Sequence, residues 1–233
     1  MSYIRTRTFV HEPVELGYDN LKTIEGKARL YITPEGDKFP SVTTILGLKT
    51  KGDIQAWRDR VGAAEADRIT RHACVRGNAL HSLAEKYLNN EDEVIEESAM
   101  PHVKLSFSVV QKVLDKHIGK IVLQECPLYS RRLRLAGRVD LVAEFDGCLS
   151  IVDFKTSSRV KTEEDIENYF MQASFYAAAF YERTGIAIKQ IVIIMIVDGQ
   201  TKPLVFIQNS YKWLPALMVV REEYRKHELF GGK

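Results

Sequence analysis

Two aspartates and a lysine interrupt an apolar stretch, residues 137–157, which reads GRVDLVAEFDGCLSIVDFKTS. Apolar residues alternate along it on both sides of Asp146-Gly147, a dipeptide typical of two-residue hairpin turns. If that dipeptide forms the loop, Asp140 lies directly across from Asp153 on one face of the hairpin. A three-residue loop would shift the register by one residue and separate the two carboxylates.

Opposed carboxylates repel each other, so such a pair is exposed, shares a proton or holds a cation. Carboxylate oxygens are ligands that Mg²⁺ and Mn²⁺ prefer, with water and phosphate oxygens completing the coordination. Lys155 lies on the same face as Asp153, where its ammonium can orient a water molecule or stabilise charge on a phosphate. The hairpin therefore suits metal-dependent hydrolysis of a phosphodiester.

The Asp-x-Lys motif by itself is weak, because so short a pattern recurs by chance. Glu25-Gly26-Lys27 matches it equally well in an uninformative context. The opposed Asp140 distinguishes the second match from the first. Spacing alone still leaves open a structural α/β protein with an exposed acidic pair.

Two helical segments add polar groups. His81, in VRGNALHSLAEKYL, offers an imidazole as a third metal ligand, and Glu85 follows one turn later, where it could orient His81 or join the metal shell. Gln172 and Tyr176 lie together on the flank of a later helix. For His81, Gln172 and Tyr176, a place at the rim of the core is the simpler alternative.

The elements that must position these residues alternate between helices and strands. We expect a hairpin within 28–46, helices over 53–90 broken at Gly62 and Gly77, and a helix over 101–117. Three strands follow, then a helix, a hairpin and a closing helix, at 119–129, 133–145, 148–155, 162–185, 191–208 and 210–228. This order predicts an α/β fold with a mixed central sheet flanked by helices.

Composition excludes several classes of protein. The 33 basic and 31 acidic residues nearly cancel, so any nucleic-acid site must come from local clusters of charge. The three cysteines are scattered, which argues against a disulfide framework, a structural zinc site and an iron–sulfur cluster. We find no membrane span and no secretion signal, and expect a cytoplasmic protein, in the host cytoplasm if it is viral.

Four motifs in order resemble the RecB-like branch of the PD-(D/E)XK nucleases: His81, Gly137–Asp140, Asp153–Lys155 and Gln172–Tyr176. Upstream, FPSVTTIL and RGNALHSLAE resemble the mitochondrial genome maintenance exonuclease and related phage exonucleases. The resemblance covers roughly residues 30–185. Val139 replaces the proline of the family's name, and the cysteines of iron–sulfur members are absent, so no such cluster is expected.

The resemblance implies a restriction-endonuclease-like core and a Mg²⁺- or Mn²⁺-dependent exonuclease that prefers single-stranded DNA ends, in replication, repair or recombination. It implies three metal-binding side chains and one backbone carbonyl, those of His81, Asp140, Asp153 and Phe154. Lys155 would be the catalytic lysine, and Gln172 and Tyr176 would position that lysine or the DNA backbone. Glu85 remains a weaker candidate ligand. A structure-specific endonuclease and a non-catalytic DNA-binding or recombination-partner module are the alternatives.

Two local excesses of basic residues bracket the motifs, each with seven Lys or Arg against four acids, at 45–81 and 128–161. We expect DNA contacts from Arg76 and Arg138, which adjoin His81 and Asp140, and from Thr156 and Ser157, which follow Lys155. We expect one nuclease domain over 1–233, with a hairpin and helical part (1–118), a catalytic sheet (119–208) and a C-terminal helix (209–233).

Overall fold

The computed structural model describes residues 7–26, 28–95 and 101–230, so both ends of the predicted 1–233 domain lie outside it. A five-stranded sheet runs through its centre, in the order β4-β5-β6-β7-β8. The strands are β4 (Ile118–Ser130), β5 (Leu135–Phe145), β6 (Cys148–Ser157), β7 (Gln190–Val197) and β8 (Leu204–Asn209). β6 and β7 pair in parallel and the other neighbours are antiparallel. The predicted mixed sheet flanked by helices is confirmed.

The β5–β6 hairpin has the expected two-residue loop. Asp146 and Gly147 both take positive φ, 52° and 77°, as that turn requires. Pairing runs from Phe145–Cys148 to Leu141–Val152 and then ends. Asp140 and Asp153 come next in this register, at the point where the two strands stop exchanging backbone hydrogen bonds.

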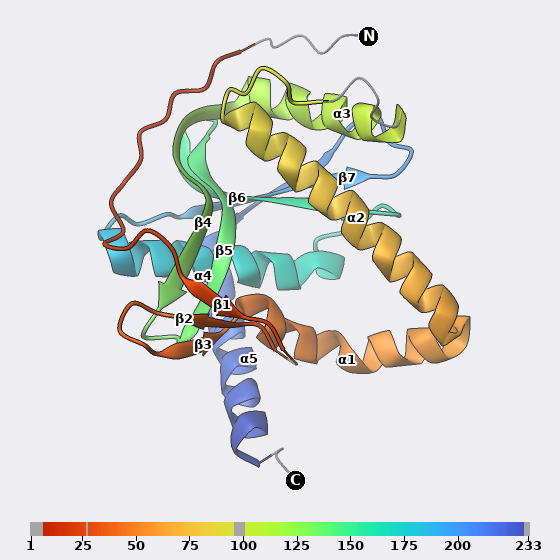
Figure 1. The fold of residues 1–233 in the computed structure, drawn as a ribbon, viewed down its shortest axis with the longest axis vertical. Helices are drawn as coiled ribbons and strands as arrows, with labels where there is room; N and C mark the ends of the chain where they lie inside the picture. The colour runs from red at the N-terminus through yellow and green to blue at the C-terminus, as the bar shows by residue number, and fades with distance from the viewer. Residues whose placement is uncertain (1–6, 27, 96–100, 231–233) are drawn as a thin grey trace.

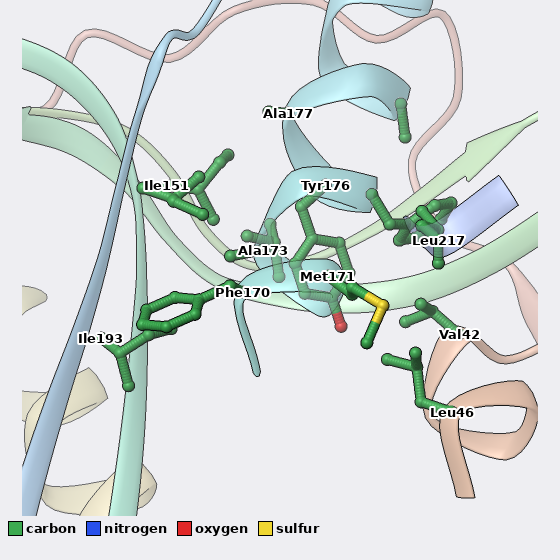
Figure 2. Packing of buried hydrophobic residues seen from close by; sticks show 14 of the residues in the cluster. Val42, Leu46, Ile151, Phe170, Met171, Ala173, Tyr176, Ala177, Ile193 and Leu217 are labelled. Atoms are coloured by element: carbon green, nitrogen blue, oxygen red, sulfur yellow. The ribbon is translucent and has the colours of Figure 1, made fainter. Parts of the chain in front are cut away.

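Helices cover both faces of the sheet (Figure 1). α4 (Glu167–Thr184) and α5 (Ser210–Phe230) pack on one face with part of α1 (Val42–Val61), and α2 (Ala63–Leu88) and α3 (Pro101–His117) pack on the other. Figure 2 shows α4 side chains lying among residues from the strands, α1 and α5. Since neighbouring residues of a strand point to opposite faces, Ile151 belongs to the first core and Val152 to the second.

A smaller sheet precedes the helices. It pairs β1 (Lys22–Ile24), β2 (Leu30–Ile32) and β3 (Lys38–Pro40) in antiparallel order. The hairpin predicted within 28–46 is thus β2–β3, and the Ser41 hydroxyl caps α1 by accepting a hydrogen bond from the Thr44 nitrogen at 3.1 Å.

The two predicted helix breaks have different outcomes. Gly62, with φ 87°, separates α1 from α2 as expected. The break at Gly77 is wrong, because α2 continues through it. A glycine costs a helix only about 1 kcal/mol relative to alanine, and packing of Leu80, Ala84 and Leu88 in the α2–α3 core outweighs that cost.

The start of α4 is also later than predicted. A 3₁₀ turn, Glu164–Ile166, precedes the regular helix, which begins at Glu167. The Asp165 carboxylate accepts a hydrogen bond from the Thr162 nitrogen at 3.0 Å, which is one half of a capping box. Gly185 ends the helix in the left-handed conformation, as predicted. Within the described part of the chain, no helix is both long and apolar enough to cross a membrane.

Candidate active site

A histidine and two carboxylates converge where α2 lies beside β4 and β5. The Nδ1 atom of His81 is 3.4 Å from Oδ2 of Asp140 and 3.8 Å from Oε1 of Glu125. Each of the three residues offers a ligand atom within 4.8 Å of the others. The predicted pair of His81 and Asp140 is therefore brought together, and Glu125 joins it.

Glu125 is a site residue that the sequence interpretation missed. It lies on β4 between the pairs Gln124–Leu141 and Cys126–Val139, and so at the level of Asp140 on β5. Its φ is 44°, an unusual value for a residue with a side chain. The Arg138 guanidinium donates a hydrogen bond to its backbone carbonyl, which holds this segment beside the start of the Gly-x-x-Asp motif.

Asp140 and His81 stabilise each other's charge. Burial alone would raise the pKa of Asp140, but hydrogen bonding and charge from His81, with the Phe154 nitrogen donating to Oδ2 at 2.8 Å, hold that pKa below its usual value. Burial likewise opposes charge on His81, but Asp140 and Glu125 outweigh it and raise its pKa to about 10. In the metal-free protein His81 is an imidazolium.

Asp153 differs from Asp140 because its negative charge is poorly compensated. The residue is fully buried, at 0 % exposed. The Lys155 ammonium forms an ion pair with its Oδ2 atom, yet no hydrogen bond of good geometry reaches either carboxylate oxygen from the described residues. Burial raises the pKa of Asp153 to about 6, with Asp140 adding to the rise and Lys155 opposing it. A buried carboxylate left this poorly satisfied is a liability for folding unless a cation completes it.

Lys155 is held in its charged form. Burial would lower its pKa, but Asp153 and Asp140 outweigh burial and raise it. Its ammonium also lies 5.1 Å from the centroid of the Tyr169 ring on α4, a cation–π distance. The side chain is thus fixed between β6 and α4.

Gln172 and Tyr176 meet as their spacing predicts. Nε2 of Gln172 donates to the Tyr176 hydroxyl at 3.2 Å, and both side chains are buried. A Cβ atom added at Gly137 would lie 2.9 Å from Cε1 and 3.0 Å from the hydroxyl of Tyr176. The glycine of the Gly-x-x-Asp motif therefore makes room for the tyrosine of the Gln-x-x-x-Tyr motif.

Gly137→Ala should lower the free energy of unfolding by about 1–3 kcal/mol, because the added methyl group overpacks the contact between β5 and α4. Urea unfolding of the two proteins measures this difference. Gly47→Ala on α1 is the matched control, since nothing lies within 4 Å of its added Cβ. The control should be neutral or stabilising, and equal effects at the two sites would contradict the close approach.

The remaining candidates are not members of this cluster. Glu85 is outside the three-residue group, although Glu125 adds to the rise that burial causes in its pKa. Arg76 pairs with Asp198 at 2.5 Å. Thr156 lies beside Gly77 of α2, and the hydroxyl of the buried Ser157 donates to the Arg159 carbonyl at 2.7 Å.

The donor set fits a divalent cation. The imidazole of His81 and the carboxylates of Glu125 and Asp140 are typical ligands of Mg²⁺ and Mn²⁺ rather than of thiolate-loving metals. Asp153 is not in this group and is paired with Lys155 instead. The buried Asp153 carboxylate is a further observation, because Lys155 is its one ion-pair partner among the described residues and no hydrogen bond of good geometry reaches either oxygen. Phe154 adds its ring edge against His81, with centroids 6.1 Å apart, and so orients the imidazole.

Comparison with known proteins supports this description. No curated protein matches the chain. A family model for the PD-(D/E)XK nuclease superfamily matches residues 54–202. That span is more than half of the chain, and it contains the histidine, the three carboxylates, Lys155 and the Gln-x-x-x-Tyr pair. The mixed sheet and its helices have the restriction-endonuclease-like arrangement of that group, whose nucleases use divalent metal ions, and the chain belongs to the PD-(D/E)XK nuclease superfamily.

Proposed function

We propose that this protein is a deoxyribonuclease of the RecB-like branch, dependent on Mg²⁺ or Mn²⁺, that shortens single-stranded DNA from its ends during replication, repair or recombination. The observation that carries the nuclease assignment is the buried Asp153–Lys155 pair next to the His81–Asp140–Glu125 cluster. The preference for single-stranded ends rests on the resemblance to exonucleases, with the basic segments as its support.

The cation would be held by His81, Asp140 and Asp153, with Glu125 and the Phe154 carbonyl as further ligands. When bound, it would supply positive charge against the scissile phosphate and acidify water. To serve as a ligand, His81 would have to lose the proton that its contacts with Asp140 and Glu125 stabilise. Glu85 is close enough to influence Glu125 electrostatically, and we assign it an outer role.

Lys155 would act on the water molecule or on the phosphate. Its ammonium is held between Asp153 and the Tyr169 ring. From there it would donate hydrogen bonds to the attacking water or to a phosphate oxygen, where negative charge grows in the transition state. Gln172 and Tyr176, bonded to each other at 3.2 Å, line this side of the site and would position the lysine or the DNA backbone.

DNA would approach past Arg138. Its side chain is exposed and already anchored to the Glu125 carbonyl, so it can contact a phosphate next to the cluster. Thr156 faces α2 beside Gly77, on the other face of β6 from Lys155, so we propose no DNA contact for it. Arg76 can contact DNA only if its ion pair with Asp198 is broken. Ser157 can do so only if its hydroxyl gives up the hydrogen bond to the Arg159 carbonyl.

The test is a gel assay on end-labelled single-stranded, duplex and circular DNA with Mg²⁺, Mn²⁺ or EDTA. Metal-dependent shortening of linear single strands, with circles spared, is the expected result. Cut circles would favour the structure-specific endonuclease. Metal-independent binding with no cleavage by folded protein would favour the non-catalytic module.

Glu125→Gln should raise the Mg²⁺ concentration needed for half-maximal cleavage by about tenfold, because it removes one negative charge from the ligand set. Activity at saturating Mg²⁺ should fall much less. Titration of cleavage rate against Mg²⁺ measures both quantities. Glu144→Gln is the control, since Glu144 lies on β5 outside the cluster and contacts the Lys120 nitrogen. An unchanged metal requirement in Glu125→Gln would remove this residue from the site.

A further inference from the structure

An apolar groove lies between α2 and α3, on the face of the sheet opposite α4. Its main cavity has a volume of about 400 Å³ and is lined largely by aliphatic side chains, among them Val75, Leu80, Leu83 and Val103. Val75 is 65 % exposed there. Volumes of this size are typical of sites that bind a ligand or the anchoring side chains of a peptide.

The groove continues toward the turn between β7 and β8. A second cavity of about 310 Å³ shares His72, Arg76 and Ser106 with the first, and Leu105 on its wall is 51 % exposed. Exposed apolar side chains beside a cavity are a feature of protein interaction sites.

The charged side chains of the main cavity are all basic. Arg71 and Arg76 stand on α2 beside His72, and no Asp or Glu is among the described residues that line it. Arg76 is paired with Asp198 at the far end. Arg71 is exposed, and no carboxylate partner is found for it in residues 7–26, 28–95 and 101–230. The groove thus presents an apolar floor with one cation at its rim, Arg71, that is not paired with a carboxylate of the described residues.

Nucleic acid suits this groove poorly. Channels for single strands combine rows of Lys or Arg with aromatic side chains on which bases stack. Here the described floor is aliphatic, and no Phe, Tyr or Trp is among the described residues that line it. Aliphatic anchors with opposite charge at the rim are instead the chemistry of peptide recognition.

We propose that the groove between α2 and α3 binds a segment of a partner protein in which apolar side chains are flanked by Asp or Glu. The apolar residues would enter the cavity beside Val75 and Leu83, and the carboxylates would pair with Arg71 at the rim. Thr156, next to Lys155 on β6, lines the inner end of the same cavity. A bound partner would therefore sit beside the catalytic strand, on the opposite side of the sheet from Lys155 and Tyr169.

The experiment selects a random dodecapeptide library, displayed on phage, against the immobilised full-length protein. The selected peptides should be enriched in apolar residues combined with Asp or Glu. The most enriched peptide, synthesised with a fluorescein label, should bind wild type in an anisotropy titration. Val75→Asp and Arg71→Glu should each weaken that binding by about tenfold or more, and added NaCl should weaken it as well.

Two variants serve as matched controls. Ile69→Asp changes an exposed apolar residue of α2 that does not line the groove, and Arg60→Glu reverses an exposed charge on α1. Both should bind the peptide as wild type does. The measurement needs no cleavage, so its result is independent of whether the nuclease assignment holds.

Three results would overturn the docking site. The selection could enrich no acidic and apolar class, or the peptide could bind Val75→Asp and Ile69→Asp equally well. Displacement of the peptide by oligothymidylate, with weaker oligothymidylate binding by Val75→Asp, would instead make the groove a nucleic-acid channel.

Discussion

Asp153→Asn should abolish DNA cleavage, by about 10³-fold or more, and should at the same time stabilise the metal-free protein at pH 8. Activity is lost because an amide cannot supply the negative charge that the cation and Lys155 both need. Stability rises because the wild-type carboxylate is fully buried without a hydrogen bond of good geometry from the described residues. Cleavage assays and urea unfolding in EDTA measure the two effects.

The sign of the stability change follows from the pKa of Asp153. Burial raises that pKa from 3.8 to about 6, so the folded protein binds the proton more tightly than the unfolded chain does. The free energy of unfolding therefore falls as the pH rises from about 4 to 6, and above this range the ionised carboxylate costs up to about 3 kcal/mol. Burying the Asn amide offsets part of the gain, which leaves an increase of about 1–2 kcal/mol at pH 8 and little change at pH 4.

Asp140→Asn is the matched control, since the same chemical change should there have the opposite effect on stability. His81, Lys155 and the Phe154 nitrogen hold the pKa of Asp140 below its usual value, so its charge stabilises the folded protein above pH 4. Both variants should be inactive, but Asp140→Asn should unfold at lower urea than wild type at pH 8. If Asp153→Asn were destabilised equally, the carboxylate would not be the unsatisfied group that the metal is expected to complete.

The paired aspartates also show how far the sequence can be interpreted. Asp146-Gly147 determines the loop, the loop determines the register, and the register brings Asp140 to Asp153. That chain of inference is local, so it needs no knowledge of the rest of the fold. Even so, the ladder ends at Leu141–Val152, and beyond it the Asp140 carboxylate accepts a hydrogen bond from the Phe154 nitrogen at 2.8 Å.

Glu125 could not be found in the same way. Its alignment with Asp140 depends on the β4–β5 connection, 131–134, whose composition of two arginines, a leucine and a third arginine indicates no turn type. In the structure Arg134 takes positive φ, 51°, at that turn. The only indication in the sequence was an acidic residue within a predicted strand, which is weak because Lys120 and Gln124 are polar residues of the same strand.

The packing contacts were equally out of reach. Gly137 has its place in the motif because the Tyr176 ring packs against it. Tyr176 follows Gly137 by 39 positions, and the β5–β6 hairpin and the loop before α4 lie between them. The α2–α3 groove depends on how two helices pack, and helical periodicity alone indicates only which face of each is apolar. Tertiary contacts of this kind are decided by the whole fold.

Lys155→Ala should reduce cleavage by about 10²–10⁴-fold without loss of metal binding, and it should also destabilise the metal-free protein. The rate falls because the ammonium that would stabilise charge on the phosphate is removed. No second Lys or Arg of the described residues is paired with Asp153. Stability falls because the buried carboxylate loses the charge that compensates it, an effect worth up to about 3–5 kcal/mol for a buried ion pair with one partner removed. Single-turnover cleavage at saturating Mg²⁺ and urea unfolding in EDTA measure the two losses.

The double variant Asp153→Asn/Lys155→Ala separates the catalytic from the structural contribution. If Lys155→Ala destabilises the protein only because it leaves the Asp153 charge uncompensated, the double variant should recover most of the lost stability. The two substitutions would then be strongly non-additive in a double-mutant cycle. Its activity should stay as low as that of either single variant, because the cation and the ammonium serve one reaction. Lys161→Ala, an exchange outside the cluster, should leave stability and cleavage nearly unchanged. Equal stability losses in Lys155→Ala and the double variant would mean that Lys155 stabilises β6 through packing against Tyr169 rather than through its charge. A Lys155→Ala protein that still cleaves at the wild-type rate would assign the chemistry to other residues.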